Sequence, residues 1–156
     1  LKNIDLKSLS DREKINLPGG ITVEPFLVPH RDEFSETVGF RIRSRSQSLV
    51  FIPDIDKWEK WPTSLTDLVR SADHLLIDGT FFADGEINRP MSEVPHPFVI
   101  ETMRVLSGLP RAERSKVHLI HFNHSNPLVQ RRRWALRQVR SAGFGVAKVG
   151  QRFVLK

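Results

Sequence analysis

Short apolar runs that stop at a polar residue or a proline constrain the fold of this sequence more than any other feature. Val38–Arg43, which alternates apolar and basic residues, and Leu49–Ile52 flank a polar turn and predict a β-hairpin. Farther along, Leu75–Ile77 and Val117–Ile120 are continuous apolar runs, which are typical of strands buried on both faces. Because the pattern changes from a hairpin to strand, helix and strand, it predicts a layered α/β fold.

The remaining segments predict further elements of such a fold. Ile21–Val28 predicts a strand, and Phe144–Val149 with Phe153–Leu155 predicts a closing hairpin. Residues 1–18 are polar and weakly patterned. Three helices are expected, over Thr63–Arg70 with Thr63 or Ser64 as its cap, over Pro97–Leu106 with Pro97 near its first turn, and over Pro127–Ala142 with Asn126 as its cap.

Length and composition exclude several classes of protein. A chain of 156 residues predicts one domain. No apolar run approaches the roughly 20 residues that cross a bilayer, so a membrane-spanning protein is not expected. The chain has no cysteine, which excludes disulfides, iron–sulfur clusters, thiolate zinc sites and cysteine nucleophiles. Any metal must therefore bind to histidine and carboxylate side chains.

The net charge of +6 is a local feature, because five arginines lie within ten residues. They are Arg131, Arg132, Arg133, Arg137 and Arg140. An apolar stripe of Leu128, Ala135, Leu136 and Val139 runs along the same predicted helix, with the arginines largely opposite. This pattern favours a solvated helix face over a nucleic-acid interface.

The chain starts at Leu1 without a charged and apolar leader, so no signal peptide is predicted. We expect residues 1–156 to be a single-domain fragment of a longer protein. The lack of disulfides is consistent with a reducing compartment, and we expect a cytoplasmic location.

Four polar side chains stand where predicted strands end: His30, Asp54, Asp78 and His121. Layered α/β folds place their ligand groups at strand ends, because the backbone there is rigid and the side chain faces open space. Neutral imidazole and carboxylate groups are the ligands that zinc or a similar divalent ion requires. The residues therefore predict part of a metal site at one edge of the sheet.

These residues lie in segments that resemble a known family. VPHRDEFSETVGFRI, LVFIPD, HLLIDGTFF, VPHPFVIETM and LIHFNHSNP, in this order, resemble the C-terminal half of the metallo-β-lactamase fold. The resemblance is greatest to the pyrroloquinoline quinone (PQQ) synthesis protein B group, whose DGTF and H-x-N-x-(S/T)-N-P segments match Asp78–Phe81 and His121–Pro127. It implies half of an αββα sandwich, with a mixed sheet and helices on one face.

The same segments resemble, more distantly, the ribonuclease Z branch of the fold, and this resemblance implies roles for single residues. It implies that His30 and His121 are metal ligands and that Asp54 is a carboxylate bridging two ions, most readily zinc. It also aligns His96 with a catalytic histidine and Asp78 with the acidic residue that orients it.

The first metal motif of the family, H-x-H-x-D-H, is absent from this sequence. Since that motif belongs to the N-terminal half of the fold, we expect the chain alone neither to hold two ions nor to turn over substrate. The missing half, or a second copy of the chain, is the expected partner.

The favoured function is a metal-dependent hydrolase-fold enzyme of the quinone-synthesis branch, acting on a small molecule with metal-bound hydroxide and His96 as proton donor. One alternative is a phosphodiesterase or nuclease similar to ribonuclease Z, and another is a non-catalytic carrier of a quinone-like ligand. Other conspicuous residues are expected to have structural roles: Trp58, Trp61, His74, His118, Asn123 and His124.

Overall fold

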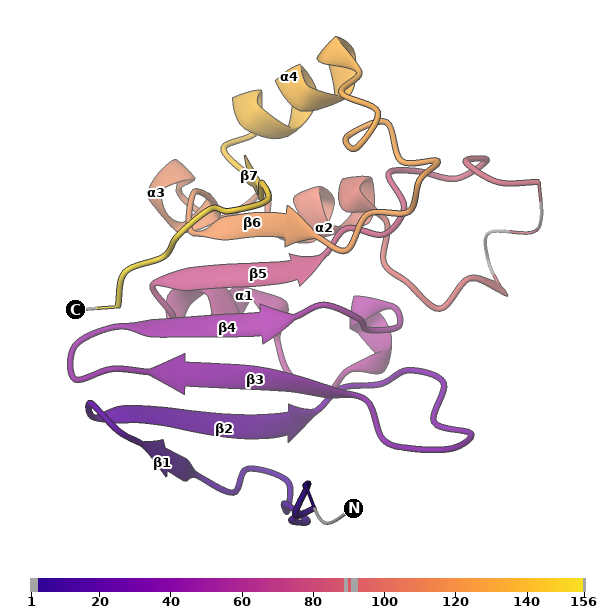
Figure 1. Ribbon diagram of the computed structural model, residues 1–156. Helices are drawn as coiled ribbons and strands as arrows, with labels where there is room; N and C mark the ends of the chain where they lie inside the picture. Colours follow the sequence, from indigo (N-terminus) through magenta and orange to yellow (C-terminus); the bar gives the residue numbers. More distant parts are fainter. Residues whose placement is uncertain (1–2, 89, 91–92, 156) are drawn as a thin grey trace.

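The computed structural model describes residues 3–88, 90 and 93–155 of the chain. These residues form a seven-stranded mixed sheet in which the strands follow one another in chain order (Figure 1). The strands are β1 (Ile15–Leu17), β2 (Ile21–Leu27), β3 (Val38–Arg43), β4 (Ser48–Ile52), β5 (His74–Asp78), β6 (Val117–Ile120) and β7 (Gly145–Val146). Pairing is antiparallel from β1 to β4 and parallel from β4 to β7. The predicted hairpin and the predicted strand–helix–strand unit thus meet in one sheet, and the α/β class is confirmed.

The described residues also form five short helices. They are the 3-10 turn η1 (Trp58–Lys60) and the helices α1 (Leu65–Arg70), α2 (Val99–Val105), α3 (Arg111–Arg114) and α4 (Arg133–Ser141). Figure 1 shows α1, α2 and α3 behind the sheet, with its other face toward the viewer. Within the described part of the chain, no helix combines the length and the apolar content that crossing a membrane requires.

The core lies between the sheet and these helices. Strand residues alternate between the two faces of a sheet. Residues that are paired across β4, β5 and β6 lie on the same face, and one set of these pairs faces the helices. These are the fully buried Val50, Ile52, Leu75, Ile77, Val117 and Leu119, which pack in one cluster with α1 and α2. Burial of such side chains stabilises the fold by about 1.5–3 kcal/mol each.

The opposite face of the sheet has no covering helix among the described residues. Most of its apolar side chains keep partial exposure, although Leu49 is buried. The partly exposed ones include Val38, Phe40, Ile42, Phe51, Leu76 and Ile120. The C-terminal segment crosses this face near the starts of β5 and β6 (Figure 1). There the ring of Phe153 contacts the rings of His74 and His118, with centroid distances of 5.3 and 5.1 Å. Most of this face is thus left without a partner layer.

Several predicted elements appear with the predicted bounds, or within a few residues of them. β3 and β6 match their predicted ranges, and Ser64 rather than Thr63 caps α1, since its hydroxyl accepts a hydrogen bond from Asp67 N at 3.2 Å. α2 begins at Val99, after Pro97 instead of around it. The edge strand β1, which pairs with β2, was not predicted.

Two predictions at the C-terminal end were wrong. The helix expected from Pro127 begins only at Arg133, because Arg131 has a left-handed backbone with φ of 56° that interrupts the helical path. Asn126 therefore does not cap α4, although its Oδ1 accepts a hydrogen bond from Leu128 N at 2.9 Å in the turn that precedes this helix. The expected closing hairpin is also absent from the described residues: β7 pairs in parallel with β6, and Phe153 contacts the sheet through its ring.

Candidate metal centre

The sheet topology brings the predicted ligands to one edge. β4, β5 and β6 are parallel, so Asp54, Asp78 and His121 lie at or just beyond their carboxyl ends. β2 runs in the same direction as β4, because both are antiparallel to β3, and His30 follows its end. His96 comes from the loop that precedes α2. The structure thus gathers all five of the predicted site residues at this edge.

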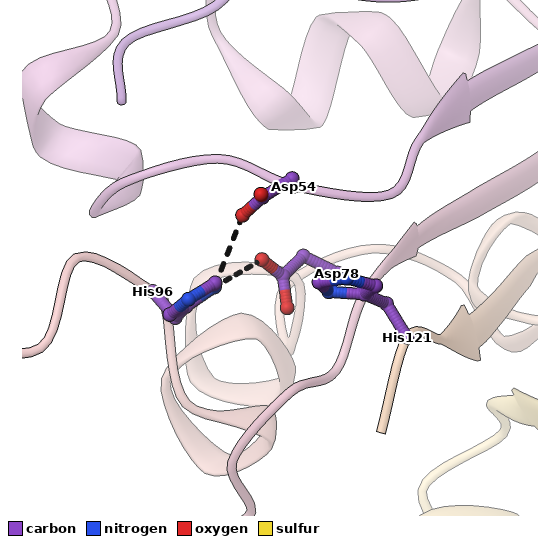
Figure 2. Close-up of side chains that lie close together, drawn as sticks. All are labelled: Asp54, Asp78, His96 and His121. Atoms are coloured by element: carbon purple, nitrogen blue, oxygen red, sulfur yellow. Dashed lines mark hydrogen bonds and ion pairs between the residues drawn. The ribbon is translucent and has the colours of Figure 1, made fainter. Parts of the chain in front are cut away.

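Four of these side chains can present donor atoms to one point. Asp54, Asp78, His96 and His121 each offer a ligand atom, and these atoms lie within 4.8 Å of one another (Figure 2). His30 is outside this group of four but adjoins it, since its ring centroid lies 5.3 Å from that of His96.

Asp54 faces two imidazole rings without a hydrogen bond. Its Oδ1 lies 3.3 Å from His30 Nε2 and 3.3 Å from His96 Nδ1. Yet this oxygen is buried and has no hydrogen-bond partner among the described residues, and the same holds for His30 Nδ1. A buried polar atom without a partner is costly. A cation held between the Asp54 carboxylate and the His30 imidazole would satisfy this oxygen, so the donor set fits a divalent metal such as zinc.

Asp78 has the opposite environment, because its carboxylate is fully buried and saturated with hydrogen bonds. Its Oδ1 accepts from the backbone N and the hydroxyl of Thr80, both at 2.7 Å. Its Oδ2 lies 2.8 Å from His96 Nδ1 and accepts from Ile55 N at 3.3 Å. An ionised carboxylate only accepts hydrogen bonds, so His96 Nδ1 carries the proton in this contact. Asp78 therefore orients His96.

His121 begins the loop after β6 with a left-handed backbone, at φ of 60°. Such a conformation is uncommon outside glycine, and it concentrates at functional sites. The side chain is directed to Thr80, whose Oγ1 lies 2.9 Å from His121 Nδ1. Thr80 was not predicted as a site residue, although it lies in the DGTF segment two positions after Asp78.

The loop after β6 is fastened to the loop after β5. Asn126 is buried and donates to the backbone oxygens of Gly79 and Thr80, at 2.7 and 3.2 Å. Asn123 donates from its backbone to Thr80 O and from its side chain to Ser125. Ser125 in turn donates to Glu86 at 2.6 Å. The two asparagines, Asn123 and Asn126, therefore brace the loop that carries His121, and the structural role expected for Asn123 is of this kind.

A second set of contacts holds the loop of His96. Glu101 in the first turn of α2 accepts from Phe98 N and from Lys57 Nζ, both at 2.8 Å. The Lys57 ammonium also lies 3.7 Å from the centroid of the Phe98 ring. Trp58 Nε1 donates to Thr102 Oγ1 at 2.8 Å. The segment that follows Asp54 is thereby joined to the helix that follows His96.

The other conspicuous residues lie outside the centre. His124 is exposed and is not among the four grouped ligands. His74 and His118 lie at the opposite ends of their strands, and burial lowers the pKa of His118. Trp58 and Trp61 are buried in the core, so the expectation that they pack is confirmed. The five clustered arginines are all exposed, as expected for a solvated face.

Known proteins share both the sequence pattern and the fold. Residues 2–122 match the family described as the beta-lactamase superfamily domain. The chain is 27% identical over 157 residues to coenzyme PQQ synthesis protein B of Gluconobacter oxydans, covering 91% of this chain and 51% of that protein. For the same protein of Nitrosococcus oceani, the identity is 29% over 140 residues, covering 81% of this chain and 43% of that one.

Among solved structures, Zn²⁺-bound PqqB from Methylobacterium extorquens superposes with a TM-score of 0.70 at 21% identity, covering 90% of this chain and 49% of that chain. The chain thus spans about half the length of the curated relatives it matches.

Proposed function

Because this chain belongs to the β-lactamase superfamily, we propose that it forms one side of the metal centre in a metal-dependent hydrolase-fold protein related in function to PQQ synthesis protein B. The observation that carries the proposal is Asp54 Oδ1, a buried oxygen without a hydrogen bond that faces His30 and His96 at 3.3 Å. Hydrogen-bonded turn residues would not leave this atom without a partner.

His30, Asp54 and His121 are the proposed ligands, and zinc is the proposed ion. Imidazole and carboxylate donors suit zinc, and the PqqB of Methylobacterium extorquens is a Zn²⁺-bound protein. Three ligands do not close a site for two ions, so a binuclear centre requires further ligands from another half of the protein or from a second copy of the chain.

The residues around the ion have distinct tasks in the proposed reaction. A bound zinc ion lowers the pKa of water toward 7 and so supplies a nucleophile at neutral pH. Asp78 accepts a hydrogen bond from His96 Nδ1 at 2.8 Å, which leaves His96 Nε2 to exchange a proton with a substrate oxygen. Lys57 and Glu101 keep the loop of His96 beside Asp54.

The test compares metal content in the protein as its gene encodes it with that in residues 1–156 alone. Both are dialysed against zinc and manganese and measured by elemental analysis. We expect about two ions in a protein with both halves, and at most one weakly held ion in this chain.

Substitutions assign the ligands. We expect Asp54→Asn and His121→Ala to lower the bound zinc, while His124→Ala leaves it unchanged, because His124 lies in the same loop but outside the centre. The proposal fails if neither form binds metal. In that case, binding of a quinone-like ligand to the metal-free protein would favour the carrier function.

A phosphodiesterase or nuclease similar to ribonuclease Z is the second candidate. The observation in its favour is the set of exposed arginines around α4, which could contact phosphate groups. RNA affinity that falls steeply with rising salt, together with no affinity for a small quinone precursor, would select this candidate.

A further inference from the structure

We infer that Thr80 is a positioning residue that fixes the tautomer of His121 and so selects Nε2 as its metal-binding atom. The inference deepens the proposed function and rests on it for the identity of the ion. Thr80 is buried, and its hydroxyl lies between two site residues, 2.7 Å from Asp78 Oδ1 and 2.9 Å from His121 Nδ1.

The protons available to the Thr80 hydroxyl and its two partners fix the tautomer of His121. A threonine hydroxyl has one hydrogen to donate and lone pairs to accept with. The Asp78 carboxylate can only accept, so the hydroxyl hydrogen is directed to Asp78 Oδ1. The contact at 2.9 Å with His121 then requires Nδ1 to be the donor. The proton of the neutral ring is thereby on Nδ1, and Nε2 keeps its free electron pair.

One buried carboxylate therefore orients two histidines from different elements. Asp78 Oδ2 directs His96 through a direct contact, and Asp78 Oδ1 directs His121 through Thr80. Each oxygen of Asp78 already has two donor partners within 3.3 Å, which occupy its acceptor positions. Although Asp78 lies within 4.8 Å of the other ligand atoms, this saturation assigns it to orientation and not to the metal.

The hydroxyl matters because His121 has little else to hold its ring. The residue is exposed, and within the described residues Thr80 is the hydrogen-bond partner of its side chain. The turn itself does not need the hydroxyl, since Thr80 N donates to Asp78 Oδ1 whatever the side chain is. Removing the hydroxyl should thus free the ring while keeping the turn.

The experiment compares Thr80→Val, which keeps the shape but loses the hydroxyl, with Thr80→Ser, which keeps the hydroxyl. Both are made in the protein as its gene encodes it. Long-range ¹H–¹⁵N correlation spectra of ¹⁵N-histidine-labelled, metal-free protein at pH 8 report which ring nitrogen carries the proton. We expect the Nδ1–H form for His121 in the wild type and in Thr80→Ser, and its loss in Thr80→Val. His96 should keep its Nδ1–H form in all three.

Zinc affinity, measured by competition with a chromophoric chelator, is the second readout. We expect Thr80→Val to bind Zn²⁺ about 10–100-fold more weakly and Thr80→Ser to stay close to the wild type. An Nε2–H form of His121 in the wild type overturns the inference even if Thr80→Val does not fold. Wild-type affinity in a folded Thr80→Val also overturns it. A wild type that binds no zinc defeats the proposed function, while the tautomer spectra still decide the role of Thr80.

Discussion

At the scale of single residues, Asp78 is the group on which the centre depends most. Its carboxylate is inaccessible to water and accepts hydrogen bonds from Thr80, Ile55 and His96. Hydrogen bonds to a buried charged group are stronger than neutral ones, and leaving their donors without a partner is costly. The same contacts that stabilise the fold here also orient the histidines.

We expect Asp78→Asn to destabilise the protein by about 1–3 kcal/mol, because an amide nitrogen would face groups that themselves donate. Urea denaturation measures this change, and histidine NMR should show His96 losing its fixed Nδ1–H form. Asp84→Asn is the control, since Asp84 is exposed and bonds only to Gly85 N among the hydrogen bonds of the described residues. Equal stability of Asp78→Asn and the control would contradict the assigned role.

His118 predicts a pH dependence of stability. Burial lowers its pKa from the ordinary value of 6.5, the hydrogen bond with Lys116 O opposes this shift, and the charge of His74 adds to it. Between the lowered pKa and 6.5 the unfolded chain binds more protons than the folded chain, so stability rises with pH in that window. The contribution of His118 is thus complete above pH 6.5 and is lost as the pH falls below it.

We expect the urea midpoint of the wild type to fall between pH 7.5 and 5.5, and to fall less in His118→Gln. Equilibrium denaturation at several pH values measures both. Equal slopes in the two proteins would show that His118 does not cause the dependence.

At the scale of elements, one position in the sheet can hold only glycine, because buried side chains lie against its backbone. Gly39 in β3 has no left-handed backbone, but a Cβ there would lie 2.6 Å from the Phe26 ring and 3.0 Å from Ile52 Cγ1. Phe26 and Ile52 are both buried, so neither can move without disturbing the core. Gly39 is thus required because a larger side chain would clash, and not because of its backbone conformation.

Gly39→Ala should therefore destabilise the protein by about 1–3 kcal/mol, the usual effect of overfilling a packed core. Gly108→Ala is the matched control, because a Cβ at Gly108 meets nothing within 4 Å. In denaturant titrations, the unfolding midpoint of Gly39→Ala should lie clearly below that of Gly108→Ala. If both behave alike, the packing between β2 and β3 is looser than the structure indicates.

At the scale of the whole molecule, the sheet has one face packed against helices and one face largely without a partner. Leu27 follows the buried Phe26 in β2, so its side chain points to the opposite, open face of the sheet, where it is 48% exposed. Large exposed apolar patches mark interaction sites, and the chain spans about half the length of the curated relatives it matches. A second layer, from another half of the protein or from a second copy, is the partner that we propose for this face.

Residues 1–156 alone should therefore self-associate, with a sedimentation coefficient that rises with concentration. We expect Leu27→Lys to weaken this association more than Val105→Lys, which adds the same charge at an exposed apolar position on α2, on the helical side. Analytical ultracentrifugation over a range of concentrations measures it. A chain that stays monomeric throughout would argue against an unpaired face.

Features that depend on residues close together in the chain could be predicted from local patterns. The alternation of Val38–Arg43 and the apolar run of Val117–Ile120 were sufficient to place β3 and β6. The start of α1 was predicted to within two residues, with Thr63 or Ser64 as its cap, and the structure selects Ser64. The strand-end positions of Asp54 and His121 also indicated one edge of one sheet, because parallel strands end together.

Features that depend on segments far apart in the chain are set by how the whole fold packs. The Asn126 side-chain oxygen accepts the local hydrogen bond from Leu128 N, but its amide group also donates to the backbone oxygens of Gly79 and Thr80, which are more than 40 positions away. The role of Thr80 likewise arises only once β5 and β6 bring Asp78 and His121 to either side of its hydroxyl. Local sequence patterns report propensity and burial, whereas hydrogen-bond partners are chosen by the packing of distant strands.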